Sequence, residues 1–571
     1  MSCKPLRVVL GWHMHQPSYQ DPVQRKIHLP WTYLHAIKDY SDMANHLRAQ
    51  PEARAVINFS PVLLIQLKYY GEHLAQDPEG LEDPLLRALY TGGPSGGIKN
   101  NEEIFFIIRC CLRANSEHMI KRFPAFERLA GLAGKILKDP TLLTYVNRHY
   151  LTDLLMWYHL AWCGETIRRQ EPRVQRLIRK EQGYSRADCR RMVSIIGKII
   201  QDVIPAYREL EAQGKVELSF SPYSHAMLPL LINFNSARES MPDTPLPGSG
   251  SNYPGGEDRA MFQIREGIKC FTEFFGHAPL GCWPSEGGIS EAALIMLGRF
   301  GLKWVASGRG VLQNSLANQN RGEHDVHKPY RYDKSGDMAC FFRDDGLSDL
   351  IGFTYKDWHA EDALNNLISH LDEIAVARAE GDPGVVTIFL DGENAWEYYP
   401  ANGYYFLSQL YERIAQHPRL RLTTFHECLE AGQMEINTLS RITAGSWICG
   451  TFSTWVGHAE KNAAWNLLIE AKRAFDREIH YLKPEQQRMA TRQLAICEGS
   501  DWFWWPGDNS AKHGKVFADL FRHQLMGLYH MLNLTSPAGL TPALDSDKMM
   551  ESNGFEATTQ EEVMHRGEPG S

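Results

Sequence analysis

The chain has 571 residues, of which 43% are hydrophobic and 22% are charged, the proportions of a soluble globular protein. Its formal net charge is −8 and it contains no dense Lys/Arg tract, so binding to nucleic acids or to anionic membranes is not expected. The sequence has no run of about 18 uncharged apolar residues, which argues against a membrane span.

Short apolar segments predict β-strands, and most of the later ones are separated by segments of helical periodicity. Strands that alternate with helices favour a parallel sheet, and seven or eight such strands favour a barrel. The sequence therefore predicts an α/β fold built on a TIM-like barrel. The predicted strands lie at 6–17, 55–61, 215–225, 278–288, 302–307, 349–355, 385–394 and 420–425.

Helical periodicity dominates two other parts of the chain. Between the second and third predicted strands, Met192, Ile195 and Ile199 belong to a pattern that repeats every three or four residues, which predicts a helical insertion. Strand signals fade again near the C-terminus, and the last residues are polar, acidic and poor in aromatics, which is typical of disorder. We expect a catalytic barrel over 1–430 that includes an insertion at about 62–212, a C-terminal α-helical bundle over 431–535, and a disordered tail over 536–571.

Two acidic residues stand where predicted strands end: Glu286 in CWPSEGG and Asp391 in FLDGEN. The carboxyl ends of barrel strands form the active sites of such folds. Two carboxylates across a cleft can hydrolyse a glycosidic bond, one as nucleophile or base and the other as proton donor. Retention of configuration needs a separation of about 5 Å and inversion about 6.5–9.5 Å. Alternatively, each acid caps a following helix or pairs with an arginine.

Histidines follow the first predicted strand. His13 and His15 are two residues apart, so on a strand they point to the same side. With Asp391 as a third ligand they would suit a metal-dependent carbohydrate deacetylase. Gln16, an amide suited to sugar hydroxyls, favours a sugar site instead. Glu217 lies among apolar strand residues, where it either lines the site or forms a buried pair with an arginine.

Four short motifs occur in a fixed order: His-x-His-Gln-Pro at 13–17, Gly-x-Val-Glu at 214–217, Trp-Pro-Ser-Glu at 283–286 and Asp-Gly-Glu-Asn at 391–394. A fifth segment, WICGTFSTWVGHAEKNAAW, follows at 447–465. Together they resemble glycoside hydrolase family 57, and within it the α-amylase and amylopullulanase branch more than the branching enzymes. The resemblance implies a distorted (β/α)7 barrel followed by a helical domain, and double displacement with retention on α-glucans.

The resemblance also implies roles for individual residues. Glu286 matches the family's nucleophile and Asp391 its general acid/base, so Glu286 should be ionised at neutral pH and Asp391 protonated. The family holds the sugar with residues that match His13, His15, Glu217, Trp283 and Glu393 here, and Trp455 and Trp465 match aromatic positions on the acceptor side. Gln16 and Trp396 complete the substrate-binding candidates.

The fifth segment departs from the family pattern. His458 follows Gly457 and Lys461 precedes Asn462 where acids are frequent, and GRGVL at 308–312 stands where an acidic pair is expected. These departures concern the acceptor side, so they leave open whether water or a second glucan is preferred. A 4-α-glucanotransferase on the same residues is therefore the main alternative to hydrolysis. A non-catalytic glucan-binding protein is a further one, and action on α-1,6 bonds stays open.

The remaining expectations concern partners and location. The proposed chemistry needs no cofactor and no catalytic metal, and the expected partner is an α-glucan or a maltooligosaccharide. Eleven cysteines are scattered without a CxxC pair or a regular spacing, which favours a reducing compartment. The N-terminus carries only a short apolar stretch without a small-residue cleavage site, so a cytoplasmic protein is predicted. The oligomeric state is left open.

Overall fold

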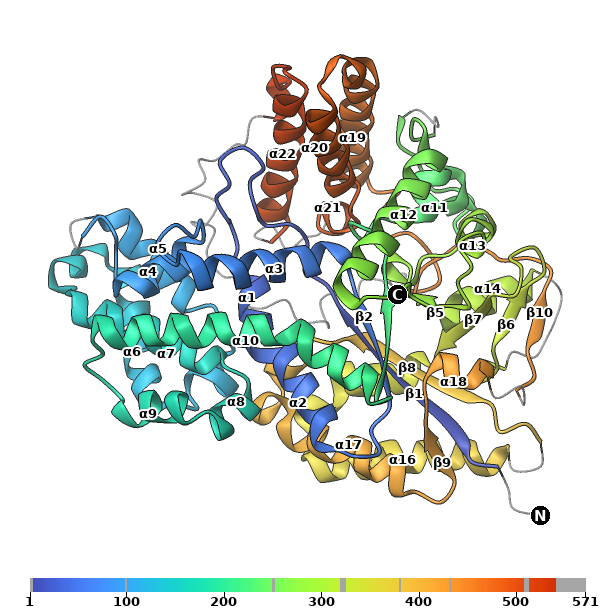
Figure 1. Cartoon of the computed structure of the whole chain (residues 1–571), viewed down its shortest axis with the longest axis horizontal. Helices are drawn as coiled ribbons and strands as arrows, with labels where there is room; N and C mark the ends of the chain where they lie inside the picture. Colours follow the sequence, from blue (N-terminus) through green and yellow to red (C-terminus); the bar gives the residue numbers. More distant parts are fainter. Residues whose placement is uncertain are drawn as a thin grey trace.

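A computed structural model of the chain describes residues 4–97, 100–248, 252–318, 325–378, 381–430, 434–507 and 513–540. Within them seven parallel strands form a ring, which lies in the right half of the molecule in Figure 1. The ring closes where Asp344 N donates to Thr387 O at 2.7 Å. Its strands, in spatial order, are β8 (Val385–Asp391), β1 (Leu6–Met14), β2 (Ala55–Phe59), β3 (Val216–Phe220), β4 (Gly281–Cys282), β5 (Trp304–Gly308) and β7 (Ala339–Arg343).

The barrel strands are apolar because both of their faces are covered. Nearly every residue of β1 and β8 is buried, as expected for parallel strands with side chains inside the barrel and helices outside it. The register places His13 beside Asn58 of β2 on one side and beside Asp391 of β8 on the other. The polar residues that end these three strands therefore lie at one rim of the barrel.

One predicted strand is wrong and one barrel strand was not predicted. The segment 349–355 is not extended: it begins at the end of helix α15 (Asp345–Asp349) and continues as a π-helical turn over Leu350–Thr354. The Asp344 side chain accepts from Leu347 N and starts this helix, which overrides the apolar run. The neighbouring strand is instead β7, a fully buried five-residue run.

Three further strands lie outside the ring. The predicted strand near 420 forms β9 (Leu420–Leu422), which pairs with the first residues of β1. Two others extend the sheet beyond β7: β6 (Tyr330–Tyr332) runs antiparallel to β7, and β10 (Asn437–Leu439) runs parallel to β6.

Helices fill the segment between β2 and β3 and form the left half of the molecule in Figure 1. Its long closing helix begins with a capping box between Ser185 and Asp188. Between β1 and β2 lie α1 (Trp31–His35) and α2 (Ser41–Ala49). The helices of the segment are α3 (Pro61–Gln76), α4 (Pro84–Thr91), α5 (Asn101–Cys111), α6 (Pro124–Lys138), α7 (Arg148–Trp162), α8 (Glu165–Gln170), α9 (Pro172–Lys180) and α10 (Arg186–Ala212).

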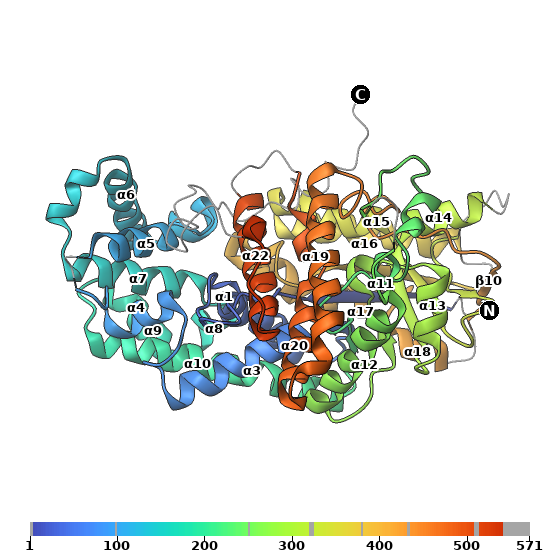
Figure 2. The same cartoon turned by 90° about the horizontal axis from the view of Figure 1, so that it is seen from above.

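The later helices surround the barrel or stand over one end of it. Those between the barrel strands and after β8 are α11 (Leu228–Ile232), α12 (Gly256–Phe275), α13 (Glu291–Gly298), α14 (Arg309–Ala317), α15, α16 (Ala360–Ala377), α17 (Tyr404–Gln416) and α18 (Phe425–Glu430). The C-terminal helices α19 (Ala459–Glu478), α20 (Pro484–Cys497), α21 (Asp501–Trp504) and α22 (His513–Met531) form the upright group at the top of Figure 1. In the view of Figure 2, this group lies between the helices of the β2–β3 segment on the left and those that surround the barrel on the right.

The start of the predicted tail is described. Ala538–Leu540 form a short 3-10 turn in which Leu540 is buried, and 541–571 lie outside the described residues. Across the part of the chain that the structure describes, no helix has both the length and the apolar character needed to cross a membrane.

Candidate active site

A cavity of about 210 Å³ lies at the carboxyl ends of the barrel strands. Six predicted site residues line it together: His13, His15, Gln16, Glu286, Asp391 and Glu393. Aromatic rings supply much of the remaining wall, and they come from elements far apart in the chain: Trp31, Trp162, Trp447, Trp504, Trp505 and Phe517. The cavity therefore combines several carboxylates with flat apolar faces, the surfaces that suit a sugar ring.

Glu286 sits on a strained turn just after β4. Its φ and ψ are 57° and 28°, in the left-handed region that non-glycine residues rarely adopt. The side chain is buried and held by two donors: Ser500 Oγ to Oε1 at 2.9 Å and Trp447 Nε1 to Oε2 at 3.2 Å. Such strain costs about 1–3 kcal/mol and occurs at functional sites. The fold thus fixes both oxygens of this carboxyl group.

Two glycines explain how Trp447 reaches Glu286. A Cβ atom on Gly308 would lie 2.6 Å from the Cα of Trp447, and one on Gly310 would lie 2.8 Å from Gly450 N. Larger residues at 308 and 310 would push this segment away from the barrel. The sequence GRGVL, which departs from the expected acidic pair, therefore permits the close packing that brings the indole to the carboxylate.

Burial raises the pKa of Glu286 from 4.5 to about 8, and the carboxylates of Asp501 and Asp391 add to the effect. The hydrogen bonds from Ser500 and Trp447 act in the opposite direction because they favour the charged form. This direction differs from the expectation that Glu286 is readily ionised at neutral pH.

This pKa predicts a pH-dependent stability for Glu286→Gln. An acid whose pKa is raised on folding contributes stability below its unfolded pKa, here 4.5, and that contribution is lost as pH rises toward 8. Glutamine has no charge to bury, so Tm of the variant minus Tm of wild type should become more positive between pH 5 and pH 9. Calorimetry in matched buffers measures this difference. A difference that is constant or falls with pH would contradict the assignment.

Asp391 ends β8, and Glu393 follows it. Asn394 Nδ2 donates to Asp391 Oδ2 at 3.0 Å. Glu393 Oε1 accepts from Gln16 Nε2 and from Tyr40 OH, both at 3.2 Å, and burial raises its pKa well above the usual range. Its Oε2 is buried without a hydrogen-bond partner among the described residues. Glu393 can therefore offer this atom to a hydroxyl group in the cavity.

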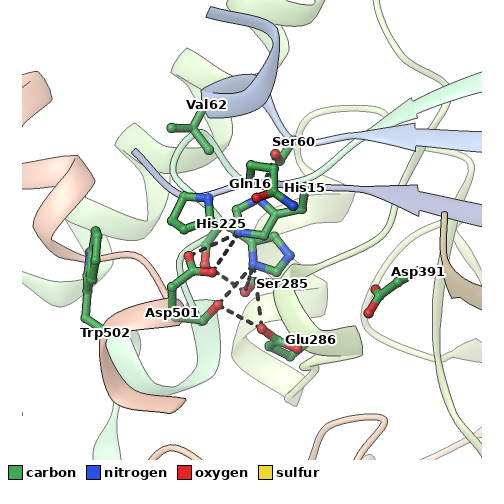
Figure 3. Close-up of polar contacts among 12 residues, drawn as sticks. His15, Gln16, Ser60, Val62, His225, Ser285, Glu286, Asp391, Asp501 and Trp502 are labelled. Atoms are coloured by element: carbon green, nitrogen blue, oxygen red, sulfur yellow. Dashed lines mark hydrogen bonds and ion pairs between the residues drawn. The ribbon is translucent and has the colours of Figure 1, made fainter. Parts of the chain in front are cut away.

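Three histidine rings stack beside the acids. The His15 and His225 centroids are 3.9 Å apart, and those of His13 and His225 are 4.9 Å apart. His15 Nε2 contacts Asp501 Oδ1 at 3.0 Å, and His225 Nδ1 contacts Ser500 Oγ at 3.0 Å. Burial lowers the pKa of His13 to about 3 and that of His225 well below 6.5, so both rings are neutral. Figure 3 shows His15, His225, Asp501 and Glu286 of this group, with Asp391 to one side at the end of another strand.

The metal alternative rests on a different set of ligands from the predicted one. The prediction combined His13, His15 and Asp391, whereas the ligand atoms that converge, within 4.8 Å of one another, belong to His15, His225 and Asp501. Both oxygens of Asp501 already contact His15 Nε2, at 3.0 and 3.1 Å. Asp501, a carboxylate outside the predicted ligand set, therefore lies within hydrogen-bonding distance of His15.

Five predicted substrate-binding residues lie behind the cavity wall. Glu217 is near the start of β3, where its carboxylate accepts from Trp304 Nε1 and His426 N. It therefore neither lines the cavity nor has an arginine as partner in these two bonds. The other four are indoles buried in the core. Trp283 stacks on Phe389, Trp396 donates to Gly392 O, Trp455 packs against Trp504, and Trp465 stacks on Phe503.

Several cavity residues were not singled out from the sequence. Trp447 lies within 447–465, where the predictions chose Trp455 and Trp465 instead. Asp501, Trp504 and Trp505 lie within 498–508, from which no residue was chosen. His225 offers one signal in the sequence, since it is the last residue of the third predicted strand segment, 215–225. Periodicity does not reveal which side of an irregular loop faces a cavity.

Fold and site together define a barrel enzyme whose cavity is lined by several carboxyl groups and aromatic rings. The sequence model of glycosyl hydrolase family 57 matches residues 9–441, and the chain belongs to this family of glycoside hydrolases. A search of curated proteins finds no match.

Solved structures share the fold. A branching enzyme of the family from Thermococcus kodakaraensis has a TM-score of 0.57 and 16% identity, over 93% of this chain and 90% of that one. A branching enzyme from Pyrococcus horikoshii has a TM-score of 0.55 and 17% identity, over 95% of this chain and 97% of that one. An α-amylase from Thermotoga maritima has a TM-score of 0.53 and 13% identity, over 96% of this chain and 99% of that one. At these identities the likeness shows the fold alone.

Proposed function

We propose that the protein is a retaining glycoside hydrolase that cleaves α-1,4-glucans through a covalent glycosyl-enzyme, with Glu286 as nucleophile and Asp391 as general acid/base. The observation that carries this proposal is the placement of these two carboxyl groups, from different strand ends, on the wall of one cavity. The membership in glycosyl hydrolase family 57 and the names of the similar structures, branching enzymes and an α-amylase, support the substrate class.

The reaction has two steps. In the first, Asp391 gives its proton to the glycosidic oxygen while a Glu286 oxygen attacks the anomeric carbon; the carbon–oxygen bond to the leaving sugar breaks. In the second, Asp391 takes a proton from a water molecule, whose oxygen attacks the same carbon and releases Glu286 as a carboxylate. Ser500 and Trp447 hold the Glu286 oxygens in place, which limits the reorientation needed for attack.

Burial is the largest cause of the raised pKa of Glu286, and the charges of Asp501 and Asp391 add to it. Because the charge on Asp391 contributes to that shift, protonation of Asp391 removes one of its causes and favours an ionised Glu286. The state in which Asp391 holds the proton is the one that the first step needs.

The site is composite under the proposed division into a catalytic barrel up to residue 430 and a helical part over 431–535. Trp447, Ser500, Asp501 and Trp504 reach the cavity or its carboxylate from beyond residue 430. The helical part therefore supplies both contacts to the nucleophile and a wall of the sugar site.

The proposal also includes the cytoplasmic location that was inferred from the sequence.

Transfer to a second glucan is the alternative that one observation favours. Lys461, which departs from the family pattern, donates from Nζ to the backbone carbonyl oxygen of Trp504 at 2.7 Å and so anchors the backbone of a residue whose ring lines the cavity. An aromatic ring fixed at the rim suits an incoming sugar as well as a leaving one.

Products from maltotriose and pullulan separate the outcomes. We expect glucose and maltose from maltotriose without longer chains, because the proposal makes water the acceptor. Maltooligosaccharides longer than maltotriose, seen by chromatography at early times, would instead assign a 4-α-glucanotransferase. Release of maltotriose from pullulan adds α-1,6 cleavage. Acetate release from an acetylated sugar polymer, with no action on either glucan, would favour the deacetylase.

A further inference from the structure

A second cluster of histidines and a carboxylate lies outside the active-site cavity. Asp21 and His28 belong to the loop between β1 and α1, and His523 belongs to α22 near the C-terminus. One potential ligand atom from each lies within 4.8 Å of the other two. Asp21 and His28 are buried, at 4% and 5% exposure. Segments separated by about the whole chain therefore bring three metal-binding side chains together.

The loop presents its two side chains rigidly. Asp21 N donates to Lys26 O at 2.8 Å, and Gln20 and Ile27 form an antiparallel bridge. Asp21 Oδ1 accepts from Val23 N and Gln24 N, both at 2.7 Å. These bonds use one carboxylate oxygen and leave Oδ2 on the side of His28, 3.9 Å from its Nε2.

Helix α22 is docked closely on this loop. Gln524 Nε2 donates to Gln20 O at 2.9 Å. A Cβ atom on Gly527 would lie 2.0 Å from Pro22, so only glycine allows the helix to approach this far. His523 directly precedes Gln524 on this helix, and its ring centroid is 5.1 Å from that of His28.

The nitrogen atoms of the cluster have the hydrogen-bonding state that metal ligands need. His523 Nδ1 contacts Asp519 O at 2.8 Å, and because a carbonyl can only accept, the proton is on Nδ1 and Nε2 keeps its lone pair. His28 Nε2 is buried and has no hydrogen-bond partner among the described residues. A buried polar atom without a partner is costly, and an ion would satisfy it.

We propose that Asp21, His28 and His523 bind a divalent transition-metal ion, with zinc as the ion their chemistry fits best. Two imidazole nitrogens and one carboxylate are a usual zinc set, with ligand distances of about 2.0–2.2 Å and a tetrahedral arrangement that a water molecule completes. The separation of 3.9 Å between Asp21 Oδ2 and His28 Nε2 closes to that geometry with shifts of a few tenths of an ångström.

The ion ties the N-terminal loop to the C-terminal helices. The same loop carries Gln16 and Tyr19, which line the cavity, and α22 carries Phe517, which lines it from the other side. Binding to the folded state alone stabilises it and fixes these two walls relative to each other. The site lies outside the cavity lining and takes no part in the proposed reaction.

Zinc binding to the full chain tests the proposal. After removal of bound metals with a chelator, titration calorimetry with ZnCl2 should show one ion bound through this cluster, together with a rise in Tm. Loss of an orienting partner alone weakens metal sites by about 10–100-fold, so His523→Ala should weaken zinc binding by at least about 100-fold. His530→Ala, which removes an exposed histidine from the same helix, is the matched control and should bind as wild type does.

Asp21→Asn is the second variant, because its amide oxygen can still accept from Val23 N and Gln24 N while the ligand oxygen is lost. It should fold and bind zinc at least about tenfold more weakly. Unchanged affinity in both Asp21→Asn and His523→Ala, or no zinc bound by wild type, would overturn the proposal. Loss of binding in His15→Ala, with Asp21→Asn and His523→Ala unaffected, would also overturn it, because the ion would then belong to the cavity cluster.

Discussion

Glu286→Gln is expected to lower turnover on maltooligosaccharides by at least about a thousandfold. Losses of this size are expected when a group that acts in the transition state is removed. An amide oxygen cannot form the glycosyl-enzyme ester, although it fills the same space between Ser500 and Trp447. Turnover is measured by release of reducing sugar, with kcat and KM determined separately; the loss should fall on kcat.

A matched control separates chemistry from folding. Glu291→Gln makes the same substitution five residues later, where the side chain accepts from Ile442 N and lies outside the cavity lining. It should keep near wild-type rates, and both variants should unfold cooperatively. Wild-type-like turnover in Glu286→Gln would remove the assignment of the nucleophile.

Asp391→Asn should show a loss that depends on the leaving group. With maltooligosaccharides we expect at least about a thousandfold lower turnover, because no proton reaches the departing oxygen. With α-maltotriosyl fluoride, whose fluoride leaves without protonation, the first step should proceed at a rate much closer to wild type. Fluoride release and reducing-sugar release measure the two cases.

No separate control for folding is needed, because both substrates are tested with the same preparation of Asp391→Asn. The second step still lacks its base, so fluoride release should begin as a burst and then slow as the glycosyl-enzyme accumulates. Equal losses on both substrates would mean that Asp391 positions the sugar and does not transfer the proton.

Much of the fold was predictable because parallel barrel strands are continuous apolar runs with polar residues at their carboxyl ends. β1 and β8 are long and buried on both faces, and they were predicted closely. β7 has five residues, and the apolar run that follows it is equally suited to a buried helix. There the cap by Asp344, a short-range contact, decides the structure.

The site residues that were predictable are those placed by the register of the strands. Those placed by irregular loops were not predictable. His13 and Asp391 end neighbouring strands, so their meeting follows from the sheet. Trp447 and Ser500 reach Glu286 through irregular segments whose paths depend on tertiary contacts such as the fit of Trp447 against Gly308. Trp465 matched a family position yet packs into the core, because its ring faces Phe503 across the bundle.

The most direct test of the central claim is peptide mass spectrometry of Asp391→Asn after reaction with α-maltotriosyl fluoride. We predict one maltotriosyl group per protein chain, in ester linkage to the side chain of Glu286. Attachment to another carboxylate of the cavity, such as Asp501 or Glu393, or fluoride release with no covalent adduct, would contradict a double displacement at Glu286.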